Sequence, residues 1–164
     1  MSEIRNAEID DLETIHDLAF AIWPAAYEEI LGKAQVNYML DKMYSLPSLQ
    51  HQFSVLKHQF IMAIEDDEPI GFASFSAHHD AKVYHLNKIY VLPREQGKNT
   101  GKQLIEYIIS DIRTAGAIAL QLNVNRFNKA LHFYEKQGFK IIREEDIDIG
   151  SGFFMNDYVM ELVL

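Results

Sequence analysis

Residues 92–104 read LPREQGKNTGKQL, and this stretch decides how the rest of the chain is interpreted. The apolar run at 89–92 before it is typical of a strand, and the run at 104–109 after it is typical of a helix. Between them lies a basic turn that contains Gly97 and Gly101. A strand that leads through such a turn into a helix directs several backbone N–H groups at one place, where the helix dipole adds partial positive charge. The stretch therefore predicts a phosphate-binding turn.

The composition bounds the class of protein. The chain has 164 residues, of which 48% are hydrophobic and 24% charged, so we predict a single domain over residues 1–164. The formal net charge of −9 argues against a nucleic-acid partner. The same charge would attract a cationic substrate, although it is also common in proteins that are merely soluble.

The absence of cysteine from the sequence excludes zinc–thiolate sites, disulfide bonds and a cysteine nucleophile. No apolar run approaches the roughly 20 residues that span a membrane. The first residues lack the basic and apolar regions of a signal peptide. We therefore expect a cytoplasmic protein with no membrane partner.

Hydrophobic periodicity predicts a mixed α+β fold. Strands are expected at residues 4–7, 60–65, 70–77, 83–92, 118–124, 139–144 and 153–164, and helices from residue 12 to Pro24, at 33–44, near 49–56, at 104–115 and at 128–137. Pro24 is expected to end or restart the first helix. Antiparallel hairpins followed by a β–α–β–α run predict a central, mostly antiparallel sheet of six to seven strands, flanked by helices.

Two motifs carry a resemblance to a known family. Residues 96–101 read QGKNTG, and residues 125–139 read NRFNKALHFYEKQGF. Together with the order of the elements, they resemble the signatures of the GCN5-related N-acetyltransferase (GNAT) family. Residues 23–27, which read WPAAY, and the pair Asp157-Tyr158 also resemble a group of bacterial members that includes polyamine-type acetyltransferases. One position departs from the family pattern, because Asn99 stands where the central glycine of the loop is usual. Asparagine is the non-glycine residue that best tolerates left-handed backbone, so the turn can still form.

The resemblance implies that acetyl-CoA is the cofactor and that the turn holds its pyrophosphate. The backbone amides that would meet the pyrophosphate belong to Gln96, Gly97, Lys98, Asn99, Thr100 and Gly101, with Lys102 nearby. The main chain of Ile89 and Val91 would pair with the pantetheine arm. Asn128 would either bond the cofactor or cap the helix that follows it.

Acid and base roles also follow from the resemblance. Tyr134 stands where the family places the general acid that protonates the leaving thiolate, although its spacing from Ala130 is equally typical of a core stripe. His85 stands where some members place a glutamate base; it would deprotonate the amine, or would simply be a polar strand residue. The adjacent pair His78 and His79 lacks carboxylates at ligand spacing, so no metal site is predicted.

The resemblance assigns the acceptor pocket to the first helices and the last hairpin. Trp23, Tyr27 and Asp157 are the candidate substrate residues, since aromatic rings and a carboxylate suit a cationic amine. Core packing is the alternative for the two aromatic side chains.

We therefore predict an N-acetyltransferase that moves acetyl directly from acetyl-CoA to a primary amine. The amine would be a small cationic molecule such as a polyamine, or a peptide amine, and the protein a monomer or homodimer. The alternative is a CoA-binding regulatory module with the same fold and little activity.

Overall fold

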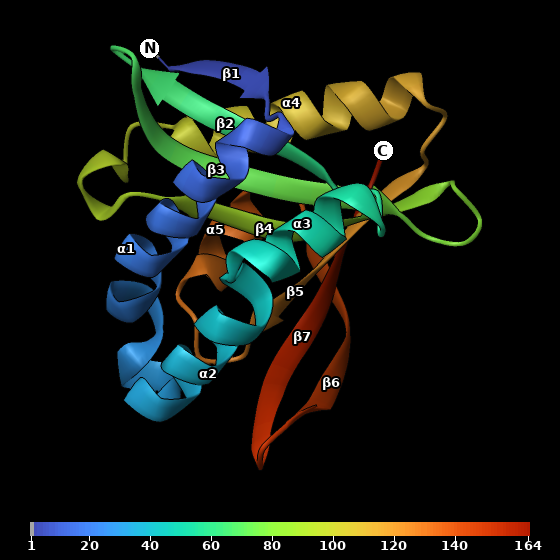
Figure 1. Ribbon diagram of the computed structural model, residues 1–164. Coiled ribbons are helices and arrows are strands. Elements are labelled where there is room, and N and C mark those ends of the chain that lie inside the picture. Colours follow the sequence, from blue (N-terminus) through green and yellow to red (C-terminus); the bar gives the residue numbers. More distant parts are fainter. Residues whose placement is uncertain (1) are drawn as a thin grey trace. The chain divides into compact units, whose positions relative to one another are not determined.

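A computed structural model describes residues 2–164, and a seven-stranded sheet in the order β1-β2-β3-β4-β5-β7-β6 is its central feature (Figure 1). The strands are β1 (Glu3–Asn6), β2 (Gln59–Glu65), β3 (Glu68–Ala77), β4 (Val83–Val91), β5 (Ala119–Asn125), β6 (Lys140–Gly150) and β7 (Phe153–Val163). The helices are α1 (Leu12–Leu31), α2 (Lys33–Tyr44), α3 (Leu46–Ser54), α4 (Thr100–Thr114) and α5 (Ala130–Lys136), with 3-10 turns η1 (Ile9–Asp11) and η2 (Pro93–Glu95). The β1–β2, β2–β3, β5–β7 and β6–β7 pairs are antiparallel, whereas β4 and β5 are parallel. The predicted fold class is confirmed.

The chain divides into two compact units. The first unit comprises Met1–Ser76 and Lys88–Ile108, and the second comprises Ala77–Asn87 and Ile109–Leu164. The boundary falls within β4, so that this strand contributes residues to both units. Whether residues 1–164 act as one domain stays a prediction.

In the first unit, α1, α2 and α3 lie in front of β2 and β3 in the view of Figure 1. Ring contacts join these layers, with 6.1 Å between the centroids of Tyr44 and Phe72 and 6.2 Å between those of Phe53 and Phe60. The middle of β2, residues 60–63, is almost fully buried. This apolar layer is the core of the first unit, because each aromatic side chain removes a large area from water.

The prediction that Pro24 ends or restarts the first helix is wrong, since α1 continues through it to Leu31. A proline inside a helix costs about 3 kcal/mol through its missing N–H and its ring clash. The aromatic rings on either side offset that cost. Trp23 is only 3% exposed and its ring centroid lies 4.5 Å from that of Tyr27, and burying an indole of this size is worth about 4 kcal/mol or more. The helix ends instead at Gly32, whose φ of +80° only glycine adopts readily.

Gly71 brings β3 close to the end of β4. A Cβ atom at this position would lie 2.8 Å from the carbonyl oxygen of Tyr90 and 3.3 Å from Cα of Val91. Just beyond, the Leu92 N–H donates to the Ile70 carbonyl at 2.8 Å. Because Gly71 has no side chain, β3 can lie this close to the end of β4, the strand that leads into the basic turn.

In the second unit, the long hairpin of β6 and β7 pairs with β5 through β7 (Figure 1). The strand predicted at 139–144 is longer than expected, because β6 runs on to Gly150. Pairing with β7 supplies the hydrogen bonds that keep the acidic segment beyond residue 144 extended. None of the helices within residues 2–164 has the length and apolarity needed to cross a membrane.

Candidate active site

The basic turn adopts the strained backbone that the sequence predicts. Gly97 has a φ of +84° and Asn99 a φ of +66°, so that both lie in the left-handed region. Asparagine tolerates this region better than other residues with a side chain, which explains how the turn forms without the usual glycine. The chain then enters α4 at Thr100, which is buried.

The turn presents backbone donors at the start of α4. The Gln103 N–H donates to the Asn99 carbonyl at 3.0 Å. The amides of residues 100–102 come before this bond, at the first turn of α4, and donate to no backbone carbonyl of residues 2–164. A Cβ atom at Gly97 would meet nothing within 4 Å, so the space beside this part of the turn is open. Amide donors, a helix dipole and open space fit the pyrophosphate of a CoA molecule.

The cationic side chains of the turn are already paired. Lys98 Nζ lies 3.1 Å from Glu95 Oε2, and Arg94 Nη2 lies 2.5 Å from Glu68 Oε1. The hydrogen bond from Lys98 holds the pKa of Glu95 below its usual range. The positive potential offered to a phosphate therefore comes chiefly from the backbone amides.

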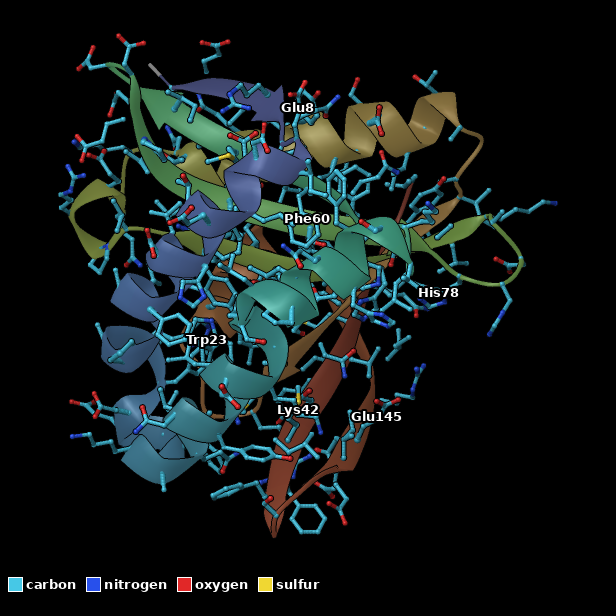
Figure 2. The ribbon with its side chains drawn as sticks, viewed as in Figure 1. Glu8, Trp23, Lys42, Phe60, His78 and Glu145 are labelled. Carbon is cyan, nitrogen blue, oxygen red and sulfur yellow. The ribbon has the colours of Figure 1, made fainter. Side chains whose placement is uncertain are left out.

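The predicted substrate residues Trp23 and Tyr27 belong to an aromatic cluster of the first unit, formed by Trp23, Tyr27, Tyr44, Phe72 and Tyr90 (Figure 2 labels Trp23). Trp23 is buried, whereas Tyr27 is half-buried and its hydroxyl lies 3.0 Å from that of Tyr90. The burial of Trp23 therefore agrees with the core-packing alternative. Tyr27 and Tyr90 contribute two neighbouring hydroxyl groups to the aromatic cluster.

Lys88 lies against the same aromatic cluster. It is 9% exposed, and its Nζ lies 5.0 Å from the centroid of the Tyr44 ring. Burial lowers the pKa of Lys88 to about 8, because removing an ammonium from water disfavours its charged form.

His85, the predicted base, lies in a polar network of the second unit. Its Nε2 is 3.0 Å from Asn123 Oδ1, and its Nδ1 is 3.0 Å from Asn87 Oδ1. The ring also stacks on that of His78, with 5.8 Å between centroids. His78 and its neighbours Ala77 and His79 line an open depression of about 420 Å³ (Figure 2 labels His78).

Two carboxylates fix the orientation of Asn123. Its amide nitrogen lies 3.2 Å from Asp157 Oδ2 and 3.4 Å from Glu145 Oε2. Because carboxylates only accept hydrogen bonds at neutral pH, the amide N–H₂ must face them and Oδ1 must face His85. His85 Nε2 therefore carries a proton. In the neutral ring Nδ1 carries none, which requires the Asn87 amide to turn its N–H₂ toward Nδ1 in place of the Oδ1 that lies there at 3.0 Å.

Asp157, the third predicted substrate residue, is buried, with only 2% of its surface exposed. Burial raises its pKa, and the charge of Glu145, directly opposite on β6, raises it further. The Asn123 amide opposes this shift by donating to the carboxylate. Asp157 therefore acts through Asn123 on the orientation of His85.

Tyr134, the predicted acid, lies on α5 and is 9% exposed. Its ring contacts those of Phe133 and Phe139, with centroids 5.5 Å and 6.0 Å away. Before the helix, Asn128 Oδ1 accepts from the Ala130 N–H at 2.9 Å. This bond agrees with the capping alternative for Asn128, and its role toward a cofactor stays a prediction.

The sequence interpretation missed Lys88 and Asn123. A signal for Lys88 exists, because it follows Leu86 by two residues and so shares the buried face of β4. No local signal marks Asn123, whose partners come from β6 and β7. Among residues 2–164, no group of three or more acidic or histidine side chains is arranged to hold a metal ion.

Comparison with known proteins places the chain in a family. The family model described as "Acetyltransferase (GNAT) family" matches residues 12–139. The spermidine N(1)-acetyltransferase of Thermoplasma acidophilum is 31% identical over 158 residues, which cover 93% of this chain and 94% of that protein. The peptidyl-lysine N-acetyltransferase YjaB of Salmonella typhimurium is 29% identical over 90 residues, or 54% of each chain.

A solved structure is similar over the whole chain. The PaiA N-acetyltransferase of Thermoplasma acidophilum, crystallised in complex with coenzyme A, superposes with a TM-score of 0.84 at 28% identity and covers 100% of this chain and 99% of its own. The family match extends over most of the sequence and both signature motifs lie within it. The chain therefore belongs to the acetyltransferase (GNAT) family of acetyl-CoA-dependent enzymes.

Proposed function

We propose that the protein transfers an acetyl group from acetyl-CoA directly to a primary amine, with His85 as base and Tyr134 as acid. The bonding network of His85 carries the proposal, because Asn123 holds the imidazole with its proton on Nε2 and its lone pair on Nδ1. Acetyl-CoA supplies the acetyl group as an activated thioester.

His85 would remove a proton from the acceptor amine. An alkyl amine is largely protonated at pH 7 and cannot attack a carbonyl until it is neutral. For Nδ1 to accept this proton, the Asn87 amide must turn or move aside, since its Oδ1 occupies that position at 3.0 Å. The depression lined by His78, which stacks on His85, supports access from solvent to this part of the second unit.

The other roles belong to the backbone of β4 and the turn, and to Tyr134. The amides of residues 96–101, with Lys102 nearby, would hold the pyrophosphate. The main chain of Ile89 and Val91 would pair with the pantetheine arm and stabilise negative charge on the carbonyl oxygen. The phenol of Tyr134 would donate its proton to the departing thiolate. No cysteine is present to carry the acetyl group, which supports direct transfer.

The acceptor would be a small cationic amine such as a polyamine, or a peptide amine. The spermidine acetyltransferase and the peptidyl-lysine acetyltransferase among the relatives support primary amines of both kinds. The acidic net charge of −9 supports the absence of a nucleic-acid partner. A monomer or homodimer in the cytoplasm stays our prediction.

A turnover assay with a panel of amines tests the proposal. Release of free thiol from acetyl-CoA should exceed the hydrolysis rate with at least one primary amine, and the product should be its N-acetyl derivative by mass spectrometry. Tight CoA binding without turnover on any amine would instead support the regulatory module, in which Asn99 marks a modified turn.

A further inference from the structure

The basic turn contains a buried carboxylate, that of Glu95. Only 6% of Glu95 is exposed, whereas the side chains of its neighbours Arg94 and Lys98 are more than half exposed. Glu95 is the last residue of η2 and directly precedes the segment whose amides are proposed to meet the pyrophosphate, and all of these residues belong to the first unit. An anion at this place opposes the binding of a phosphate, because like charges repel each other.

Glu95 also engages the two cations of the turn. Its Oε2 lies 3.1 Å from Lys98 Nζ, and its Oε1 lies 3.6 Å from Arg94 Nη1. The hydrogen bond from Lys98 lowers the pKa of Glu95, so the carboxylate is charged at neutral pH. Because Glu95 is buried, salt screens its attraction for Lys98 less than it screens an exposed pair. The turn therefore supplies an anion of its own for these cations.

Two more carboxyl groups border this cluster. Arg94 Nη2 lies 2.5 Å from Glu68 Oε1, and a hydrogen bond from the Glu65 carboxyl also lowers the pKa of Glu95. The charges of Glu68 and Glu95 balance those of Arg94 and Lys98, so the side chains of the cluster leave no net positive charge to attract a phosphate. A phosphate that contacts Lys98 must compete with Glu95 for it.

We propose that Glu95 limits the affinity of the protein for CoA by holding Lys98, and so promotes the release of CoA after acetyl transfer. When CoA binds, its pyrophosphate replaces the Glu95 carboxylate as the partner of the Lys98 ammonium. Glu95 thus sets the affinity for the cofactor and takes no part in the chemical step. The inference rests on the proposed placement of the pyrophosphate at this turn, and it is independent of the amine acceptor.

Glu95→Gln keeps the shape of the side chain and removes its charge. The dissociation constant of CoA should fall by at least about 3-fold at low ionic strength, because a nearby anion is lost and Lys98 is released. Isothermal titration measures this constant, and stopped-flow measurements should show slower release of CoA. Glu106→Gln is the matched control, since it also removes one negative charge but its 3.9 Å contact with Lys102 is exposed on both sides. The control should change the dissociation constant by less than about 2-fold.

Lys98→Met distinguishes an exchange of partners from the simple removal of a negative charge. If Lys98 passes from Glu95 to the pyrophosphate, the gain in affinity from Glu95→Gln should disappear in the Lys98→Met background. A gain that survives in that background would overturn the inference. So would unchanged or weaker binding of CoA by a Glu95→Gln protein whose melting temperature matches that of the parent.

Dephospho-CoA tests which phosphate group is concerned, because it lacks the 3′-phosphate and keeps the pyrophosphate. The gain in affinity from Glu95→Gln should be the same with dephospho-CoA as with CoA. A gain that appears only with CoA would overturn the exchange of Lys98 onto the pyrophosphate.

A measurement on the parent protein covers the case in which Glu95→Gln does not fold. Because Lys98 lowers the pKa of Glu95 in the free protein, loss of this contact should raise that pKa when CoA binds. A titration of the Glu95 ¹³Cδ resonance with and without CoA measures the change, and an unchanged or lower pKa would overturn the inference. None of these experiments needs turnover, so a failure to acetylate any amine would contradict the proposed function alone.

Discussion

Asn123 joins His85 to two carboxylates: its Oδ1 lies 3.0 Å from His85 Nε2, and its amide nitrogen lies within 3.4 Å of both Glu145 and Asp157. Glu145 and Asp157 stand opposite each other on β6 and β7, an arrangement that like charges disfavour. The Asn123 amide donates to both and so lessens their repulsion. The same arrangement directs the Asn123 Oδ1 at the imidazole of His85. Glu145 and Asp157 therefore determine, through Asn123, that Nε2 of the proposed base carries a proton.

His85→Gln should lower kcat by about 100-fold, because an amide can replace the hydrogen bond to Asn123 but cannot take a proton from an amine. The pH–rate profile of the variant should also differ from that of the parent, because the proposed base is missing. Steady-state rates from pH 5.5 to 9 measure both effects. A variant profile that matched the parent would remove His85 from the proton transfer.

Tyr134→Phe should lower kcat by about 100-fold and leave the fold intact, since only the proton donor is lost while the ring contacts with Phe133 and Phe139 remain. The circular dichroism spectrum and the melting temperature serve as the control for folding. Unchanged turnover would show that Tyr134 is a core residue, which is the alternative its helical spacing also predicts.

Asn99 provides a test of the turn. Asn99→Gly relieves a left-handed conformation at φ +66° and should change the dissociation constant of CoA by less than about 3-fold. Asn99→Val should raise it by more than about 10-fold, because a β-branched residue is strongly disfavoured at positive φ. Isothermal titration with CoA measures both. Similar affinities in all three proteins would mean that the turn does not set CoA binding.

The turn and α4 could be predicted because glycine, asparagine and a helical apolar pattern act locally. The candidate site could be predicted only in part. Motif positions suggest His85 and Tyr134, whose roles stay a prediction. The Asn123 network depends on the register of β5, β6 and β7, which no short stretch of sequence encodes. The burial of Lys88 likewise depends on α2 covering β4, and the continuation of α1 through Pro24 depends on the packing of Trp23.

Asp157→Asn should make the protein relatively more stable as pH rises. The pKa of Asp157 is raised by burial, so folding disfavours its charged form, and the parent loses stability from this group as pH rises through that raised value. Below the unfolded value of about 3.9 the carboxyl is protonated in both states and the penalty vanishes. The melting temperature of the variant minus that of the parent should therefore increase from pH 4 to pH 7.

Asp80→Asn is the control with the opposite sign. The Lys82 and Val83 N–H groups donate to the Asp80 carboxylate and lower its pKa, so this group stabilises the parent above its unfolded pKa. Asp80→Asn should lose stability relative to the parent as pH rises through the acid range to about pH 5, above which the carboxyl is ionised in both states and the difference stays constant. Equal trends for the two variants would contradict the assignment of Asp157 as a buried acid.

Lys88 predicts a pH dependence at the alkaline end. Because burial lowers its pKa to about 8 from 10.5, the unfolded chain binds more protons than the folded protein between these values, and stability rises with pH. The full gain is on the order of 3 kcal/mol in the free energy of unfolding. Lys88→Met lacks this gain. The free energy of unfolding of the parent minus that of Lys88→Met, measured by urea denaturation, should therefore increase between pH 7 and pH 10. Lys42→Met should follow the parent.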